Sequence, residues 1–269
     1  LPISNISQRL PRQEPVAHMD DFFWWIVLIG FVAQLIDGAL GMAYGLTSTS
    51  LLITMGLPPA QASATVHAAE IATTAVSGTA HHFARNVDWR MVRVLAISGA
   101  LGGCAGAALL SSGLGKYLAP IVALYLSALG VLVIAKAVRK VQPPAAMRGL
   151  TPLGFVGGFL DAVGGGGWGP IVSSTLVYRA NETRRMLGTS AAAEFFVTVA
   201  ITVTFAGAFG LESFGMAALA LVIGGVPAAP MAAVLVKVIP RKPLMIAVGV
   251  LIVILGIVGL YRFASALLA

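Results

Sequence analysis

The chain contains one pattern twice: the pattern that starts at Gly30 starts again at Gly154, an offset of 124 residues. Residues 30–45 read GFVAQLIDGALGMAYG, and residues 154–169 read GFVGGFLDAVGGGGWG. In each copy an apolar segment runs into an aspartate and then into a glycine-rich break, which an aromatic residue and a glycine close. This register, which continues without a gap beyond the motif, indicates a duplicated unit with the break at its centre. The same offset aligns Thr65, Ala68, Ala69, Glu70 and Thr74 with Thr189, Ala192, Ala193, Glu194 and Thr198.

The composition is that of a membrane protein. Hydrophobic residues make up 58% of the 269 residues, charged residues only 10%, and the mean hydropathy is +0.92, whereas soluble proteins carry about 25% charged residues. Apolar runs of about 20 residues recur from Phe22 almost to the C-terminus, as membrane-spanning helices require. The net charge of +7 comes from bases in the loops between these runs, which argues against a basic face for nucleic acid. The single cysteine, Cys104, excludes an internal disulfide and a thiolate metal site.

The duplication predicts an all-α polytopic fold. We expect a polar tail over 1–21, a first repeat over 22–140, a cytoplasmic linker over 141–150 and a second repeat over 151–264. Each repeat would hold a helix pair broken at the glycines, with a short second helix, followed by three transmembrane helices. The expected helices are about 22–39, 44–56, 61–84, 91–112 and 117–138 in repeat one, and about 151–164, 168–179, 183–206, 214–236 and 243–262 in repeat two.

The positions of the bases predict the orientation. Thirteen of the 17 lysines and arginines lie in four segments, 85–93, 136–148, 179–185 and 237–242, which marks these segments as cytoplasmic. All four can lie on one side only if each broken pair enters and leaves by the same face. Each repeat then crosses the membrane three net times, so the repeats are inverted and both termini are external. Inverted repeats with broken helices are typical of secondary transporters.

Four acidic residues lie inside the apolar segments as two repeat-related pairs, Asp37 with Asp161 and Glu70 with Glu194. An ionised carboxylate at the bilayer centre costs about 2.5–3.5 kcal/mol on insertion scales, and we expect no Lys or Arg within the spans to pair with these. They must therefore face a wet cavity, accept hydrogen bonds or be protonated. Asp37 and Asp161 stand where caps are needed for the second half-helices. Glu70 and Glu194 have no helix end to cap, which favours proton coupling or gating.

The breaks themselves are candidate anion sites. Glycine lets each first helix stop and turn, which leaves bare N–H groups at the positive start of the next half-helix. The donors that we expect to face the substrate are those of Gly41, Gly45, Gly165, Gly166 and Gly167. Hydroxyl groups and two aromatic walls would complete the site, from Thr47, Ser48, Ser173, Tyr44 and Trp168. The alternative is that glycine and serine only permit close helix packing, as in the Gly99-Gly102-Gly106 series.

One predicted helix carries a polar stripe whose steps of four and three residues place it on one face. Its members are Ser63, His67, Glu70, Thr74, Ser77 and His81. His67 and Glu70 are one turn apart, so they can share a proton or a hydrogen bond, and we assign His67 to proton coupling with the glutamates. Ala191 stands at the repeat position of His67, which leaves too few ligands for a metal. We expect no metal site and no cofactor, and the glycines at 164–169 lack the strand–turn–helix context of a dinucleotide site.

At these residues the chain resembles a known family. The break IDGALGMAYG, the helix SATVHAAE with its trailing HHFARNVD, and the second break LDAVGGGGWGP look like the TauE/SafE sulfite exporter family, over nearly all of 22–262. The resemblance implies a permease of the cell (inner) membrane that moves small sulfur-containing oxyanions such as sulfite, sulfoacetate or other organosulfonates, usually outward. Where many members have glycine in both breaks, repeat one here has Leu40, Met42 and Ala43. The site is therefore expected to be lopsided toward repeat two.

The sequence thus predicts a secondary transporter, and not an enzyme, that exports a small sulfur-containing oxyanion coupled to protons. Its partners would be the anionic substrate and the lipid bilayer, with no nucleic acid, and the oligomeric state stays open. A passive ion channel or cation-conducting permease is the alternative, since four buried acids and no buried base suit cations. A membrane protein that assembles with a partner and transports nothing is a third reading.

Overall fold

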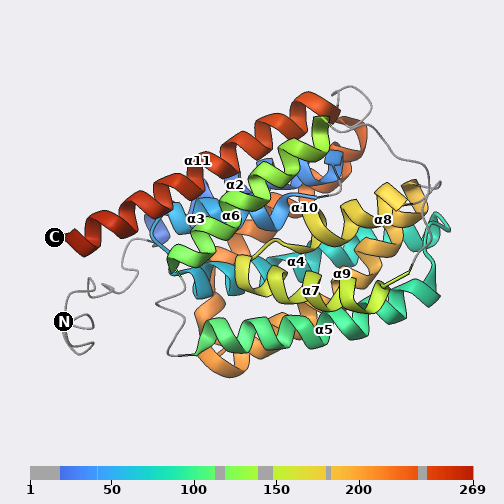
Figure 1. The fold of residues 1–269 in the computed structure, drawn as a ribbon, viewed down its shortest axis with the longest axis horizontal. Helices are drawn as coiled ribbons and strands as arrows, with labels where there is room; N and C mark the ends of the chain where they lie inside the picture. Colours follow the sequence, from blue (N-terminus) through green and yellow to red (C-terminus); the bar gives the residue numbers. More distant parts are fainter. Residues whose placement is uncertain are drawn as a thin grey trace.

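The structure is a computed structural model, and it describes residues 19–40, 42–112, 119–138, 148–179, 183–235 and 241–268. Most of the predicted tail, Gly41 and most of the predicted linker lie outside these ranges. Every regular element within them is a helix, and the helices pack side by side in an elongated bundle (Figure 1). The chain is therefore an all-α protein, as the sequence predicts.

In the first half of the chain, prolines and a capping aspartate set helix starts. Pro58 and Pro59 open α4, because proline fits the first turn, where its missing N–H is not needed. Asp88 caps α5 by accepting hydrogen bonds from the backbone N–H groups of Arg90 and Met91, at 3.0 and 3.3 Å. The helices of this half are α2 (Met19–Leu40), α3 (Tyr44–Thr54), α4 (Pro59–Phe83), α5 (Trp89–Ser111) and α6 (Ala119–Val138).

In the second half, the helix predicted over 168–179 is not one α-helix. A π-helical turn, η3, comes first and a short α-helix follows, with Pro170 near the start of the turn. The elements of this half are α7 (Leu150–Gly164), η3 (Gly169–Ser173), α8 (Ser174–Arg179), α9 (Thr183–Phe209), the 3₁₀ turn η4 (Leu211–Phe214), α10 (Gly215–Leu235) and α11 (Arg241–Leu268).

Three of the helices begin or end at least three residues from the predicted bounds, and one of them, α9, ends at Phe209 instead of 206. α2 begins at Met19, inside the predicted tail, where Asp20 and Asp21 suit the positive start of a helix. α11 runs to Leu268 instead of 262, because its last residues are good helix formers without a glycine or proline.

Three helices in the described ranges are long and apolar enough to cross a membrane, and others are apolar but shorter. The three are Trp89–Ser111, Pro120–Val138 and Arg184–Phe209, and the shorter ones are Phe22–Asp37, Leu150–Gly164, Gly215–Ala229 and Met245–Val258. α4 is 25 residues long, but its polar stripe makes it too polar to count among these apolar spans.

The two halves pack mainly against each other. The main helix pairs all combine one helix from each half: α5 with α7, α2 with α10, α6 with α11, and α4 with α9. Figure 1 shows α6 beside α11 along one edge of the bundle and α5 beside α7 at the opposite edge. The apolar core is therefore formed by both halves together.

Glycines let the outer pairs approach backbone to backbone. On α5, a β-carbon at Gly106 would lie 2.5 Å from the carbonyl oxygen of Phe159, and one at Gly102 would overlap the carbonyl oxygen of Phe155 on α7. On α2, a β-carbon at Gly30 would lie 2.6 Å from the carbonyl oxygen of Leu221 on α10. Membrane helices associate by such close packing of small residues, so the packing explanation holds for the Gly99-Gly102-Gly106 series.

Gly102→Ala tests this packing, with Gly207→Ala as its control. At Gly102 the added methyl meets a backbone oxygen that cannot move away, and overpacking costs about 1–3 kcal/mol. At Gly207, on α9, no atom lies within 4 Å of the new β-carbon, so the better helix former adds up to about 1 kcal/mol of stability. We expect thermal unfolding of detergent-purified protein to occur at lower temperature for Gly102→Ala and at equal or higher temperature for Gly207→Ala. Equal unfolding temperatures would show that the α5–α7 contact is loose.

Candidate functional site

The two breaks meet at the centre of the bundle. A β-carbon on Gly45, in the first turn of α3, would lie 2.6 Å from the carbonyl oxygen of Gly165 and 2.9 Å from the Cα of Gly166. Thr49 on α3 also donates a hydrogen bond to the Gly165 carbonyl at 2.7 Å. The backbones of the two breaks therefore touch, and no side chain fits between them.

A second contact between the breaks corresponds to the first under the 124-residue offset. A β-carbon on Gly169 would lie 2.7 Å from the Cβ of Met42, and the offset carries Gly45 to Gly169 and Met42 to Gly166. The predicted donors Gly45, Gly165 and Gly166 thus come together, but the sides of these residues that a β-carbon would occupy face the other break. Gly167 differs, since its β-carbon would lie 2.7 Å from the hydroxyl of Tyr125.

Each aspartate accepts a hydrogen bond from the residue that starts the next half-helix. Asp161 Oδ1 accepts from the backbone N–H of Trp168 at 2.9 Å, and Asp37 Oδ1 accepts from that of Tyr44 at 3.3 Å. Gly165 ends α7 in the left-handed conformation, at a φ of 66°, and its N–H donates to the carbonyl of Asp161 at 2.6 Å. This is the geometry of caps across a break, with the same spacing in both copies.

The sequence suggested that His67 pairs with Glu70, but in the structure His67 lies against Asp161. Its Nε2 is 3.2 Å from Oδ2 of Asp161, and its Nδ1 is 2.8 Å from the carbonyl oxygen of Ser63, one turn back on α4. The Ser63 hydroxyl donates across to the carbonyl of Ala162 on α7 at 2.6 Å. Because the Ser63 carbonyl holds Nδ1 of the ring, Nε2 on the other side of the imidazole points to the end of α7, where Asp161 lies.

This geometry leaves a single proton between the two side chains. The carbonyl of Ser63 can only accept, so Nδ1 carries a proton, and Nε2 and Oδ2 need one more proton between them. That proton lies either on Nε2, giving an ion pair, or on Oδ2, giving a neutral pair, and in both states the net charge is zero. The side chains are 0% and 2% exposed, and such burial requires a pair of this kind. Loss of this proton would leave two acceptors facing each other and would remove the hydrogen bond between α4 and α7.

Glu70 and Glu194 face the same region from α4 and α9. Glu70 is 5% exposed, its Oε2 has no hydrogen-bond partner, and its Oε1 would lie 2.7 Å from a β-carbon on Gly45. It lies within electrostatic range of Asp161, Glu194 and Asp37, so the four carboxylates form one group around the contact between the two breaks. In the part of the chain that the structure describes, no three of its His, Cys, Asp and Glu residues form a cluster able to hold a metal.

The aromatic residues that were predicted to wall the site are packed into the core. Trp168 is fully buried, and its Nε1 donates to Ser190, whose hydroxyl also lies 2.7 Å from that of Ser173. Tyr44 is 3% exposed, and its hydroxyl donates to the carbonyl of Leu221 at 3.3 Å. Each aromatic residue anchors one of two buried apolar clusters, so both fasten the breaks to the surrounding helices.

Buried hydroxyl groups without partners mark the polar lining of this region. The hydroxyls of Thr47, Ser48 and Ser50 on α3 have no hydrogen-bond partner, and neither has that of Tyr125. A buried polar group left unpaired costs about 1–3 kcal/mol, so these groups call for water or a polar ligand. Of the predicted binding residues, Thr47 and Ser48 therefore keep free hydrogen-bonding capacity, while that of Ser173 is engaged by Ser190.

Lys136 is a residue that the sequence reasoning missed, since no base was expected to act within the spans. It lies in the last turn of α6, and its ammonium group donates to the carbonyl of Pro170 at 2.7 Å and to the hydroxyl of Ser174. Lysine near the end of a membrane helix usually helps to set the orientation of the protein in the membrane. Here the Lys136 side chain instead holds the π-helical turn of the second break. Its position inside a predicted apolar span was the available signal.

Substitutions at Asp161 separate its two contacts. Asp161→Ala removes the acceptor for the Trp168 N–H, and the loss of such a cap costs about 0.5–2 kcal/mol. Asp161→Asn keeps an amide oxygen for that N–H while it removes the carboxylate that shares a proton with His67. We expect a clear drop in the unfolding temperature of detergent-purified Asp161→Ala and a small one for Asp161→Asn. An unchanged unfolding temperature for the alanine variant would contradict the capping geometry.

Comparison with known proteins agrees with the resemblance noted in the sequence. The model of the family described as sulfite exporter TauE/SafE matches residues 26–259. A relative from Bacillus subtilis (strain 168), the "Probable membrane transporter protein YtnM", is 43% identical over 218 residues, which covers 78% of this chain and 73% of the relative. No solved structure gives a significant match. Sequence, helical fold and comparisons together show that the chain is a multi-pass membrane transporter that belongs to the TauE/SafE sulfite exporter family.

Proposed function

We propose that this protein is a secondary transporter that exports a small sulfur-containing oxyanion together with protons. The observation that carries the proposal is the buried pair of His67 and Asp161, whose single shared proton joins α4 of the first half to the break of the second. A proton held at the contact between two halves can control how they pack. The family description, sulfite exporter, and the resemblance of the breaks supply the substrate class.

The anion would lie beside α3 and contact unpartnered hydroxyls of this helix, on which Thr47 and Ser50 share one face and Ser48 lies on another. Hydrogen bonds to an ion contribute about 1.5–3 kcal/mol each, so one or two such donors can replace part of the water that an oxyanion loses. The packed faces of Gly45 and Gly166 make the glycine N–H groups secondary donors in this proposal. The substrate site then centres on the first half, whereas the sequence favoured the second.

Electrostatics requires protons to accompany the anion. An ionised Glu70 repels a second negative charge by about 4 kcal/mol at 4 Å when the effective dielectric constant is near 20. Protonation of Glu70 removes this repulsion, so anion and proton favour each other's binding. We assign Glu70 as the group that binds the transported proton, with Glu194 beside it and the His67–Asp161 pair as the relay between them and the break.

We further propose that the two halves are inverted repeats in the cell (inner) membrane, with both termini external. The exchange of helices between halves supports this arrangement, because α5 packs on α7 where α10 packs on α2, and the 124-residue offset interchanges the two pairs. The paired contacts of Gly45 with Gly166 and of Gly169 with Met42 follow the same symmetry. The base-rich segments then lie on the cytoplasmic side.

A cation pathway is the second candidate, because four carboxylates lie around the contact between the two breaks and Glu70 Oε2 has no hydrogen-bond partner. The two functions differ in what moves. Purified protein in liposomes should carry a sulfonate such as sulfoacetate with saturation and with dependence on a pH gradient. Flux of sodium or potassium that does not saturate, with no sulfonate flux, would instead establish the cation pathway.

The proton route is tested by Glu70→Gln and His67→Gln, with His82→Gln as the control. Glutamine at position 70 resembles a glutamate that stays protonated, so sulfoacetate exchange at equal pH should persist while acceleration by a pH gradient disappears. His67→Gln should weaken the acceleration, and His82→Gln, an exposed residue of the same helix, should behave as wild type. The measurement is radiolabelled sulfonate flux, since sulfite itself takes up a proton near neutral pH. Full pH coupling in Glu70→Gln would rule out the assigned role.

The orientation is tested by single cysteines in a Cys104→Ser background. Arg90→Cys should react only with an impermeant thiol reagent supplied from the cytoplasmic side, and Glu212→Cys only with reagent supplied from outside. The two positions lie in segments that the repeat offset aligns, 85–93 and 209–217, so opposite labelling is the signature of inversion. Labelling of both from one side would contradict inverted repeats.

A further inference from the structure

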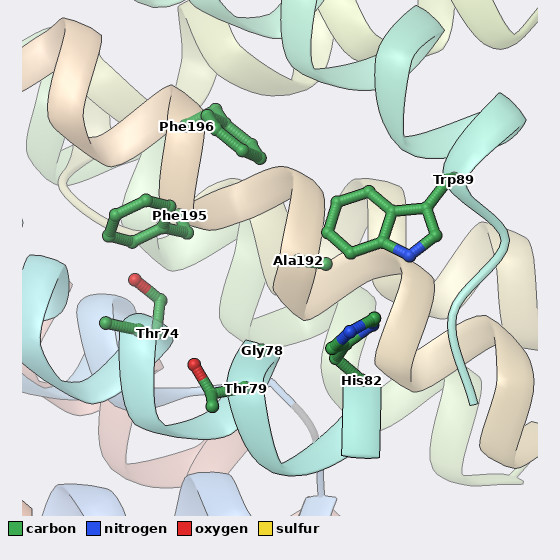
Figure 2. Close-up of a pocket in the computed structure, with 9 residues that line it drawn as sticks. Thr74, Gly78, Thr79, His82, Trp89, Ala192, Phe195 and Phe196 are labelled. Atoms are coloured by element: carbon green, nitrogen blue, oxygen red, sulfur yellow. The ribbon is translucent and has the colours of Figure 1, made fainter. Parts of the chain in front are cut away.

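A pocket of about 340 Å³ opens between α4, α9 and the start of α5 (Figure 2), and none of its lining residues belongs to the breaks. Phe195 and Phe196 of α9 lie at one side of it, and His82 of α4 and Trp89 of α5 lie at the other. Thr74, Thr79 and Ala192 complete the wall. The volume is within the range of about 300–1,000 Å³ that ligand pockets have.

The position and lining of this pocket fit a hydrocarbon chain that enters from the bilayer. Trp89 and Phe196 are each 46% exposed at its rim, so the opening lies on the side of the bundle. Trp89 begins a membrane-length helix, as tryptophan does at the level of lipid headgroups. From His82 to Thr74 the pocket follows eight residues of α4, roughly 12 Å at 1.5 Å per residue, which leads from the headgroup level toward the bilayer centre. An apolar wall of this kind does not suit a free oxyanion.

Three arginines without carboxylate partners lie close in sequence to Trp89, at the same end of the pocket. Arg85, Arg90 and Arg93 are exposed, and no carboxylate of the described residues lies within ion-pair distance of them. The nearby Asp88 pairs instead with Arg185, at 3.1 Å. Arg93 lies one turn after Trp89 on α5 and one turn before Ile97, which is 66% exposed, so its guanidinium is on the lipid-facing side of the helix.

We propose that the pocket binds one acyl chain of an anionic phospholipid whose headgroup phosphate contacts Arg90 and Arg93. The apolar cavity, its lateral opening and the unpaired bases at its headgroup end match the two parts of such a lipid. The occupant would touch α4 and α9, the helices that carry Glu70 and Glu194. The site does not depend on the proposed transport function, and it can be tested without substrate.

Quenching of Trp89 fluorescence by brominated lipids provides the test. The chain has four tryptophans; Trp24→Phe and Trp25→Phe remove two exposed ones, and Trp168 is fully buried, so Trp89 reports lipid contact. In vesicles of phosphatidylcholine, a small fraction of brominated phosphatidylglycerol should quench Trp89 several-fold more than the same fraction of brominated phosphatidylcholine. Equal quenching by the two lipids would overturn the proposal, and so would protection from both, which would indicate a second protein chain over the pocket.

Matched variants locate the two parts of the lipid. Arg90→Gln combined with Arg93→Gln should abolish the preference for phosphatidylglycerol, while Lys242→Gln, which removes an exposed base at the start of α11, should keep it. Thr79→Phe, which fills the pocket from an exposed position, should reduce the preference, while Val203→Phe at the repeat-related position, which is also exposed, should not. A preference that survives both the arginine and the Thr79 variants would show that the pocket is not the site.

Discussion

The contact between the two glycine breaks is the constraint on which the rest of the structure depends. Gly45 lies against Gly165 and Gly166, backbone to backbone, and this approach is possible only without β-carbons. Asp37 and Asp161 fasten the half-helices to the ends of α2 and α7, and the buried Tyr44 and Trp168 fasten them to the surrounding helices. As a result, four carboxylates gather in one small region of an otherwise apolar bundle.

That gathering is the reason why we propose that a proton takes part in transport. His67 and Asp161 hold one proton between them at net zero charge. Asp161, one of the four acids, therefore needs no lysine or arginine to balance its charge. Glu70 keeps an oxygen without a hydrogen-bond partner, and three hydroxyls on α3 lack partners as well. A site with unused hydrogen-bonding capacity and a repelling carboxylate accepts an anion only when that carboxylate is neutral. The proposed coupling of anion and proton follows from this arrangement.

The sequence predicted the helical membrane fold, the family and the aspartates at the breaks, because these depend on local composition, spacing and duplication. It did not predict which groups on different helices meet. The stripe on α4 placed His67 one turn from Glu70, but the Ser63 carbonyl and the end of α7 turn the ring to Asp161. Spacing also could not show that Gly45 and Gly166 face each other and not a substrate, or that Lys136 reaches the π-helical turn at Pro170. Each of these contacts depends on how one half packs on the other.

The central claim is that the anion binds together with a proton at Glu70. Calorimetry of sulfoacetate binding in buffers of different ionisation enthalpy measures the protons taken up with each bound anion. The account predicts uptake of protons by the wild-type protein near neutral pH and loss of that uptake in Glu70→Gln, which still binds the anion. Binding of sulfoacetate without proton uptake in the wild type would contradict the account.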